Sequence, residues 1–413
     1  MPVSAAEAED TDTLRRGNKV TLPPLRDIRD IHRDSTLNQK EKARRYGNFI
    51  VRIIDAFDDI DTNYVERIPY NFTAMLQATR NFEFYTVGTQ DYAQRLSFAE
   101  RSNIRIGPYF GWRWLFFGYT FDVAHLGQRP KKQGTNIDFS FYTSKLGVDL
   151  LYRRTGSSFY FRRIEGLGDE AKRFEGADAG DYIQASVTGL KLYWIFNNRR
   201  FSNRAIYSQS TIQRRSAGSF QLGANFTLHD VRFNYKSLPQ ELFLDVDNRS
   251  IFASLERVKY TNISLQVGYA YNWVPARNWC LGFSLQPAIS YQLASTKTAI
   301  LLDESETTDT VAHSKLYGIF RQRSSLGFDL TGRAGLIYNN GRWFAGLTGI
   351  LHNYNYHRQE MRFSNTFGSL NLFVGFYFQR RKTAAEKQAA KATPALPAES
   401  VPTQKAPIPV IEF

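Results

Sequence analysis

The chain has 413 residues, a net formal charge of +14 and a mean hydropathy of −0.41, although 15% of its residues are aromatic. No apolar run approaches the ~20 residues that a membrane-spanning helix needs, and the single cysteine, Cys280, excludes an intrachain disulfide and a cysteine-based metal site. An aromatic-rich chain of low hydropathy is typical of a transmembrane β-barrel, because alternating faces average out in any hydropathy window. A soluble β-sandwich, the alternative, would have shorter strands and denser turns.

The N-terminal region is polar and charged. We expect residues 1–38 to be disordered and residues 39–70 to form an amphipathic helix with a periplasmic lead-in. Apolar side chains recur there at helical spacing: Tyr46, Phe49, Ile50, Ile53, Ile54 and Phe57. Three placements of this helix remain open, namely packing on a barrel mouth, plugging a lumen, or lying on the inner leaflet surface.

Residues 259–294 carry the clearest pattern, two strands of roughly fifteen residues joined by a turn at residues 274–277, whereas a strand averages about five or six. One face is apolar: Ile263, Leu265, Val267, Tyr269, Tyr271 and Trp273, then Trp279, Leu281, Phe283, Leu285, Ile289, Tyr291 and Leu293. The other face is small or amide-bearing. This is the lipid-out, lumen-in alternation of a transmembrane barrel.

Similar patterns predict a barrel over residues 71–380, followed by a disordered Ala/Pro/Lys-rich periplasmic tail over 381–413. Twelve strands are predicted: 72–86, 101–111, 114–126, 136–152, 157–165, 182–197, 217–229, 259–273, 278–294, 322–338, 342–357 and 366–380. Short turns predicted at the periplasmic end are residues 112–113, 153–156, 274–277 and 339–341. The fold class is therefore an all-β, antiparallel, up-and-down transmembrane barrel of about twelve strands with a short N-terminal amphipathic helix.

The segment 197–216 is too long for an ordinary periplasmic turn and contains five arginines. If its strand-like part were counted as membrane-spanning, every later strand would cross the membrane in the opposite direction. We therefore predict a basic periplasmic connection and regard it as a candidate functional element.

The tryptophans give an independent indication of topology, because tryptophan favours the membrane interface. All six lie within about three residues of a proposed periplasmic turn and are predicted to form an aromatic girdle: Trp112, Trp114, Trp194, Trp273, Trp279 and Trp343.

Arginines crowd the same predicted end: Arg113, Arg153, Arg154, Arg199, Arg200, Arg277, Arg342, Arg380 and Arg381. Two proposed outer loops, 165–181 and 303–309, are acidic instead. Since nucleic-acid binding requires basic residues interleaved with stacking aromatics in a groove, we expect no nucleic-acid partner.

The face opposite the apolar one is predicted to line the lumen: Asn262, Ser264, Gln266, Asn272, Ser284, Gln286, Ser290, Gln292, Asp329 and Arg333. Asp329 and Arg333 lie four apart on one strand and therefore share a face. They are interpreted either as a structural ion pair or as a charge constriction that selects solutes.

No catalytic, cofactor or metal site is predicted. The six histidines lack metal-ligand spacing, and no metalloprotease, nucleophile-elbow or phosphate-loop motif is present. A barrel hydrolase would need a serine, a histidine and an orienting Asn or Asp on neighbouring strands, and the sequence pattern does not assign Ser290 and His352 to a common face.

Several local motifs resemble an outer-membrane barrel family of Bacteroidota that is catalogued only as a domain of unknown function: residues 111–114 (GWRW), 147–154 (GVDLLYRR), 196–202 (FNNRRFS), 207–220 (YSQSTIQRRSAGSF), 269–273 (YAYNW), 338–341 (YNNG) and 376–378 (FYF). The resemblance spans about 45–380. It implies an outer-membrane barrel and carries over no catalytic residue, ligand or partner.

We therefore expect a protein of the outer membrane of a Gram-negative bacterium, porin-like and not an enzyme, that forms a narrow channel or uptake barrel for small polar solutes. A barrel-anchored scaffold acting through its periplasmic segments is the alternative, and an embedded lipid-modifying enzyme is the third. Expected partners are outer-membrane lipids and a periplasmic protein or peptidoglycan that binds 197–216 and the tails. The first eight residues lack the basic and apolar regions of a signal peptide, so we expect a trimmed or misassigned start.

Overall fold

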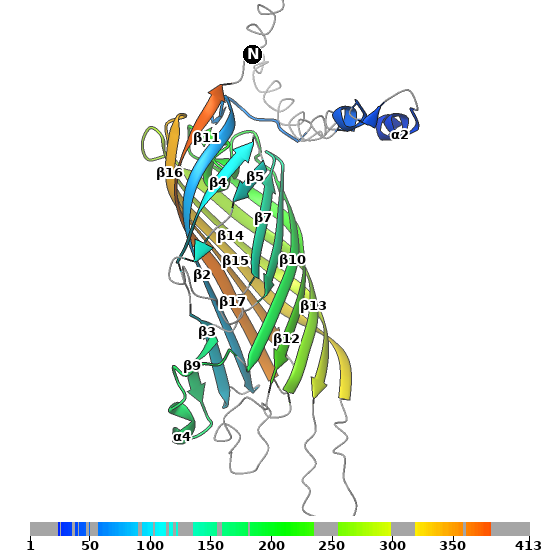
Figure 1. The fold of residues 1–413 in the computed structure, drawn as a ribbon, viewed down its shortest axis with the longest axis vertical. Coiled ribbons are helices and arrows are strands. Elements are labelled where there is room, and N and C mark those ends of the chain that lie inside the picture. The colour runs from blue at the N-terminus through cyan, green and yellow to red at the C-terminus, as the bar shows by residue number, and fades with distance from the viewer. Residues whose placement is uncertain are drawn as a thin grey trace, which may run out of the picture.

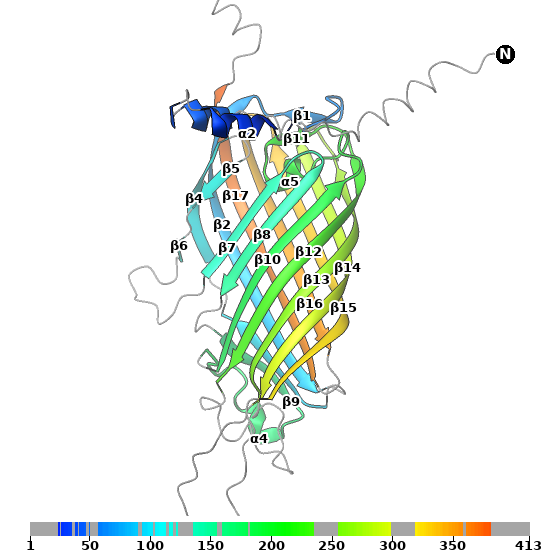
Figure 2. The same cartoon turned by 90° about the vertical axis from the view of Figure 1, so that its right-hand side faces the viewer.

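The computed structural model describes residues 57–89, 93–101, 104–112, 115–118, 121–122, 135–154, 159–180, 182–234, 255–298, 319–357 and 361–380, with short stretches between 24 and 49. Its main feature is one antiparallel sheet curled into a barrel, as Figure 1 and Figure 2 show from two directions. Of the ends predicted to be disordered, 1–38 and 381–413, residues 1–23 and 381–413 lie outside the described residues, as does the acidic stretch 303–309, whereas residues 26–33 are helical.

Twelve strands follow one another along the barrel in the order β5, β4, β2, β17, β16, β15, β14, β13, β12, β10, β8 and β7. Their bounds are β2 (Tyr70–Thr89), β4 (Ile104–Trp112), β5 (Leu115–Gly118), β7 (Thr135–Tyr142), β8 (Leu146–Arg154), β10 (Ile183–Ile195), β12 (Ala217–Phe233), β13 (Leu255–Trp273), β14 (Trp279–Thr298), β15 (Ile319–Asn339), β16 (Trp343–His357) and β17 (Met361–Arg380). The predicted fold class and strand number are confirmed.

The remaining elements are not among these twelve strands. They are α2 (Arg26–Arg33), β1 (Val65–Arg67), β3 (Arg95–Glu100), β6 (Phe121–Asp122), β9 (Phe159–Glu165), α4 (Asp169–Lys172), α5 (Arg204–Tyr207) and β11 (Thr211–Gln213). Strand β3 pairs with β2 and β9, and β1 pairs with β11 in a separate two-stranded sheet. In the predicted helical stretch 39–59, residues 41–46 are helical and 50–56 lie outside the described residues.

Two errors in the predicted strands cancel, so that the predicted number of barrel strands is still twelve. The prediction of one strand over 136–152 is wrong, because β7 and β8 form a hairpin around residues 143–145. The segment 157–165 forms β9, which pairs with β3 and is not one of the twelve. The missed turn contains no Gly or Pro, and contacts from elsewhere stabilise it: the Ser144 hydroxyl donates to the Phe57 carbonyl at 2.7 Å.

The two ends of the barrel differ in their connections. Tyr70 and Arg380, the first and last barrel residues, pair at the end that also carries the short connections 143–145, 274–278 and 340–342. We call this the turn end. Strands β3 and β9 and helix α4 lie at the opposite end, which we call the loop end (Figure 1). The turn predicted at 153–156 is misplaced, because Arg154 pairs with Ser186, far along β10 from the turn end.

The alternation of side chains separates an apolar exterior from a layered interior. Leu265, Leu285 and Leu326 on the outer face are 56–73% exposed, as a lipid-facing surface requires. Inside, apolar clusters occupy both ends. The turn-end clusters include Ile206, Phe344 and Tyr193, and the loop-end cluster includes residues of β3, β9 and β13. Polar side chains fill the layer between them.

Candidate functional site

The interior layer contains the ten residues predicted to line the lumen. None is more than 7% exposed, and each alternates with lipid-facing residues along its strand. They are Asn262, Ser264, Gln266, Asn272, Ser284, Gln286, Ser290, Gln292, Asp329 and Arg333. Their low exposure means that other side chains, and not open solvent, fill the space around them.

An ion pair lies in the middle of this layer. The Arg333 guanidinium contacts the Asp149 carboxylate, with side-chain exposures of 3% and 14%, and also donates to the Tyr142 hydroxyl at 3.1 Å. Tyr142 and Ser140 in turn donate to Asp149 Oδ1 at 3.0 and 2.7 Å. The pair joins β15 to β8 across the lumen, so the interior is cross-linked by charge-assisted hydrogen bonds.

Asp329 and Arg333 do share the inner face of β15, but each has a different partner. Asp329 Oδ2 accepts from Asn262 Nδ2 at 2.7 Å, whereas the carboxylate that Arg333 contacts belongs to Asp149. Residues four apart on a strand are separated by two pleats, and the lumen offers both groups nearer partners on other strands.

A second polar link crosses the lumen through Lys191, which the sequence analysis did not single out. Lys191 Nζ donates to Gln286 Oε1 at 2.5 Å, and Gln286 Nε2 donates to Gln221 Oε1. The signal for Lys191 is present in the sequence: it stands between Leu190 and Leu192, which are 38% and 41% exposed, so alternation assigns it to the inner face.

Residues 196–216, which we call the cap segment, close the lumen at the turn end. Its helix α5 places Ile206 wholly out of solvent against Gly282 and Gly335, where an added Cβ would come within 2.6 and 2.5 Å of Ile206 carbons. The Tyr377 hydroxyl donates to the Gln209 carbonyl at 2.5 Å. The two glycines thus leave the space that Ile206 fills, and the predicted long connection packs inside the barrel mouth.

Residues 57–68, the strap segment, hold the cap segment from the other side. The Asp58 carboxylate pairs with Arg204 at 2.6 Å, with exposures of 17% and 11%. The Asp61 N–H donates to the Arg199 carbonyl at 2.8 Å, and the Arg214 N–H donates to the Tyr64 carbonyl at 2.7 Å. These contacts, with the β1–β11 pairing, place the strap across the barrel mouth (Figure 2).

The aromatic residues predicted as a girdle occupy the turn end where the structure describes them. Trp194 pairs in register with Leu146, Trp279 with Tyr338 and Trp343 with Phe376. Trp273 adjoins the 274–278 turn and is 50% exposed. The backbone of Trp112 pairs with Phe72, and Trp114 lies outside the described residues.

Arg153 was expected at the turn end among headgroups, and this expectation is wrong. Its side chain is 3% exposed and lies inside the barrel, with the guanidinium 4.6 Å from the Phe367 ring centroid. The physical reason is the shift of the neighbouring turn to 143–145, which moves the end of β8 toward the loop end.

The structure does not bring Ser290 and His352 together as a catalytic pair. Ser290 Oγ accepts from Gln292 Nε2 at 3.2 Å, and His352 Nδ1 lies 3.3 Å from the Thr331 hydroxyl. Among the described residues, no three His, Cys, Asp or Glu side chains converge as metal ligands. No helix in the described part of the chain has the length and apolar character needed to cross a membrane.

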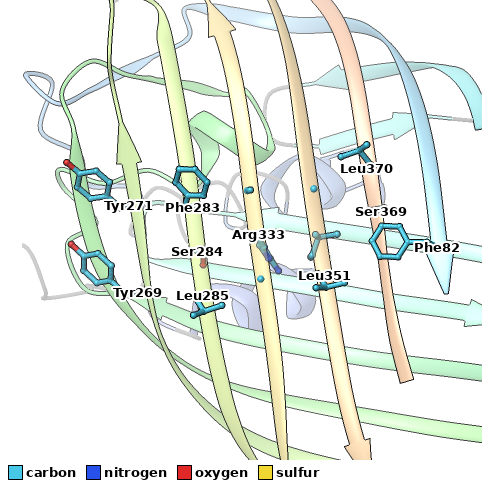
Figure 3. A pocket seen from close by; sticks show the side chains of 14 residues that line it. Phe82, Tyr269, Tyr271, Phe283, Ser284, Leu285, Arg333, Leu351, Ser369 and Leu370 are labelled. Atoms are coloured by element: carbon cyan, nitrogen blue, oxygen red, sulfur yellow. The ribbon is translucent and has the colours of Figure 1, made fainter. Parts of the chain in front are cut away.

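A hollow lies on the apolar exterior over β14 to β17, where small residues interrupt the larger ones (Figure 3). Phe283, Leu285 and Leu370 stand around it, and Gly332 and Gly349 form part of its floor. An added Cβ on Gly332 would meet no atom within 4 Å. Glycine is therefore not required there by packing, in contrast to Gly335 beside the cap segment.

The strand order, the apolar exterior and the closed polar interior define a twelve-stranded transmembrane β-barrel with an internal cap. Residues 59–378 match the family described as "Domain of unknown function (DUF4421)", and the chain belongs to this family. A search of curated proteins found no match.

Among solved structures, the chain is similar to the outer membrane protease OmpT from Escherichia coli, with 9% identity over 77% of this chain and 100% of that chain and a TM-score of 0.35. It is also similar to the translocator domain of the autotransporter NalP from Neisseria meningitidis, with 12% identity, coverage of 84% and 99%, and a TM-score of 0.27. The Pseudomonas putida toluene transporter TodX matches at 7% identity, coverage of 76% and 91%, and a TM-score of 0.20. These scores are too low to carry a conclusion about function.

Proposed function

We propose that this chain is an outer-membrane β-barrel of a Gram-negative bacterium, without catalytic activity, that conducts small polar solutes through a lumen closed by the cap segment. The exposed apolar belt supports the membrane location. The turn end would face the periplasm, because short turns and both strand termini lie on that side in bacterial barrels. Origin in the Bacteroidota is proposed from the motif resemblance alone.

The observation that carries the channel proposal is the buried polar layer around Arg333, Asp149 and Lys191. A barrel that served only to anchor a protein in the membrane would need a filled interior but no buried charges. Replacing buried ion pairs by well-packed apolar residues is often neutral or stabilising. Side-chain amides and charges in a lumen can instead replace the hydration shell of a passing solute.

The cap segment is suited to act as the gate because it is not part of the barrel wall. It is joined to β10 and β12 only at its ends, and much of its attachment is polar, through Asp58, Gln209 and Asn272. Rupture of a few hydrogen bonds and of the Ile206 packing would therefore open the turn end without breaking the strand ladder.

A barrel-anchored scaffold is the second candidate, and one observation favours it: apolar clusters close the interior at both ends. In that case the cap and strap segments would serve as a binding surface, and the polar layer would only stiffen the barrel.

Single-channel conductance in a planar bilayer distinguishes the two candidates. Deletion of residues 1–56 keeps the strap segment, whereas deletion of residues 1–68 removes it and leaves β2 intact. We expect little conductance from the full chain and the shorter deletion, and steady conductance from the longer one. Silence of all three proteins, each verified as folded by its heat-modifiable migration, would reject the channel and leave the scaffold.

A disulfide gives the converse test. Arg67 and Thr211 face each other across β1 and β11, one position from the hydrogen-bonded pair Ile68–Ser210 and three from Tyr64–Arg214, so alternation makes them a non-hydrogen-bonded pair with closely spaced side chains. Cysteines at 67 and 211, in a Cys280→Ala background, should hold the cap shut. The oxidised protein should stay silent under voltages that open the same protein after reduction, and equal conductance in both forms would show that the cap is not the gate.

A further inference from the structure

Two arginines of the cap segment lie on one aromatic ring of the strap segment. The Arg200 guanidinium carbon is 5.1 Å and that of Arg215 is 5.7 Å from the centroid of Tyr64. Both arginines are exposed. The two positive charges can therefore be no farther apart than these two distances combined, which is on the order of the Debye length of roughly 8–10 Å at physiological salt.

The backbone beneath these arginines is fixed by one buried side chain. Gln213 is 2% exposed, and its Nε2 donates to the Arg200 carbonyl at 2.6 Å and to the Arg215 carbonyl at 2.9 Å. The Gln213 Oε1 accepts from the Ser202 N–H and from Asn272 Nδ2, both at 3.1 Å. Gln213 thus links the two ends of the cap segment by hydrogen bonds and fixes the backbone positions from which both arginine side chains extend.

The neighbouring arginines have carboxylate partners. Arg199 lies 3.8 Å from the Asp59 carboxylate, and Arg214 lies 2.5 Å from that of Glu66. Within the described part of the chain, Arg200 and Arg215 form no ion pair. The strap segment therefore neutralises one arginine of each adjacent pair and presents the other to solvent on a tyrosine face.

An anion that binds between these two exposed like charges would offset the repulsion that solvent and salt leave unscreened. A cation–π contact contributes only ~0.5–1 kcal/mol at an exposed site, and the two guanidiniums repel each other. Each retains the planar fork of donors that recognises a carboxylate in bidentate fashion. The arrangement is thus preorganised for two anionic groups that lie a fixed distance apart.

The position of the pair indicates the kind of partner. Both arginines belong to the cap segment, which lies over the mouth of the barrel, whereas Arg277 and Arg342 stand in short turns of the rim, close in sequence to Trp279 and Trp343. Headgroups gather around a rim, but the mouth faces the aqueous compartment. In an extended polypeptide, alternate side chains lie on one face about 7 Å apart, a spacing that suits two charges flanking one ring.

We propose that Arg200 and Arg215, positioned by Tyr64 and Gln213, form a docking site for an extended polypeptide segment with acidic residues at alternate positions. This inference does not depend on whether the lumen conducts.

The test is the affinity of a fluorescein-labelled (Glu-Thr)₅ peptide for the full-length barrel in a neutral detergent, measured by fluorescence anisotropy, with (Gln-Thr)₅ as the uncharged control. We expect saturable binding of the acidic peptide only, and a loss of about tenfold in affinity for each of Arg200→Gln and Arg215→Gln. The matched controls are the single variants Arg277→Gln and Arg342→Gln, each of which removes one positive charge from the rim and should change the affinity less than about twofold.

Substitutions at Tyr64 distinguish two explanations of the affinity, namely the placement of the two arginines by the ring and a general effect of positive charge. Tyr64→Leu leaves the net charge unchanged but removes the ring, so the affinity should fall, whereas Tyr64→Phe keeps the ring face and should bind as the native protein does. Equal losses in the cap and rim variants, or native affinity in Tyr64→Leu, would overturn the proposal. The proposal would also be overturned if phosphatidylglycerol displaced the peptide and its own binding were lost in Arg200→Gln/Arg215→Gln. That result would assign the site to a lipid headgroup.

Discussion

Substitution of Asp149 by asparagine tests whether the lumen is stabilised by its buried ion pair. The Asp149→Asn side chain keeps an acceptor for the Ser140 and Tyr142 hydroxyls, but it leaves Arg333, 3% exposed, without a counter-charge. Removing one partner of a buried pair costs ~3–5 kcal/mol, because the remaining charge is left uncompensated. We expect a loss of this size in the free energy of unfolding.

The reciprocal change should cost less. In Arg333→Met the Asp149 carboxylate keeps two hydroxyl donors, so we expect a loss of ~1–3 kcal/mol. The double variant Asp149→Asn/Arg333→Met no longer contains a buried charge from this pair and should recover much of the larger loss, with a coupling energy of ~2 kcal/mol.

The assay is urea unfolding of the barrel in phospholipid vesicles, followed by tryptophan fluorescence. Ser140→Ala, which removes one hydroxyl donor to Asp149 and leaves both charges in place, is the matched control and should cost no more than ~1 kcal/mol. If the losses of the two single variants simply add in the double variant, the ion pair does not act as a unit and the reasoning fails.

Three further perturbations test the cap and the barrel wall. Gly335→Val should force Ile206 from its place, raise conductance and cost ~1–3 kcal/mol, whereas Gly332→Val on the same strand, with open space at its Cβ, should leave both unchanged. Equal effects of the two valines would contradict the assignment of Ile206 as the seal. Gln213→Ala removes three donated and two accepted hydrogen bonds, so limited trypsin digestion should cut the cap segment many times faster than in the native protein. Unchanged digestion would mean that Gln213 does not hold the cap. Leu285→Arg, at a position 56% exposed on the lipid face, should lower stability in vesicles by ~2–4 kcal/mol if it lies near the bilayer midplane, and a loss near zero would argue against a lipid-facing β14.

The barrel wall could be predicted from sequence because its signal is local. In β13 and β14 each residue's face follows from its neighbours two positions away, and the alternation from Ile263 to Trp273 is uninterrupted. The same rule placed ten named polar residues on one face, and in the structure each of them is buried. Prediction failed at 143–145, where neither Gly nor Pro is present and the strap segment, about 85 residues earlier, supplies the stabilising contacts.

The interior pairings could not be predicted for a different reason. Asp149 and Arg333 lie 184 residues apart, and they meet only because every intervening register and the curvature of the sheet bring β8 opposite β15. Alternation shows that a side chain points inward, but it gives no information about what lies across the lumen. The folding of the cap segment into the mouth, with α5 and β11 packed against Gly282 and Gly335, likewise depends on strands that come later in the chain.

The packing of the cap segment against later strands bears on how the barrel is assembled. The cap segment is synthesised before β14 and β15, yet Ile206 can reach its final place only after both strands have been added, and β1 must still lie across β11. If the strands join the barrel in chain order, the structure implies a stage in which the wall is nearly complete while the mouth is still empty. An assembly factor or a chaperone acting at that stage would meet an unsealed cylinder, and sealing would mark the end of maturation.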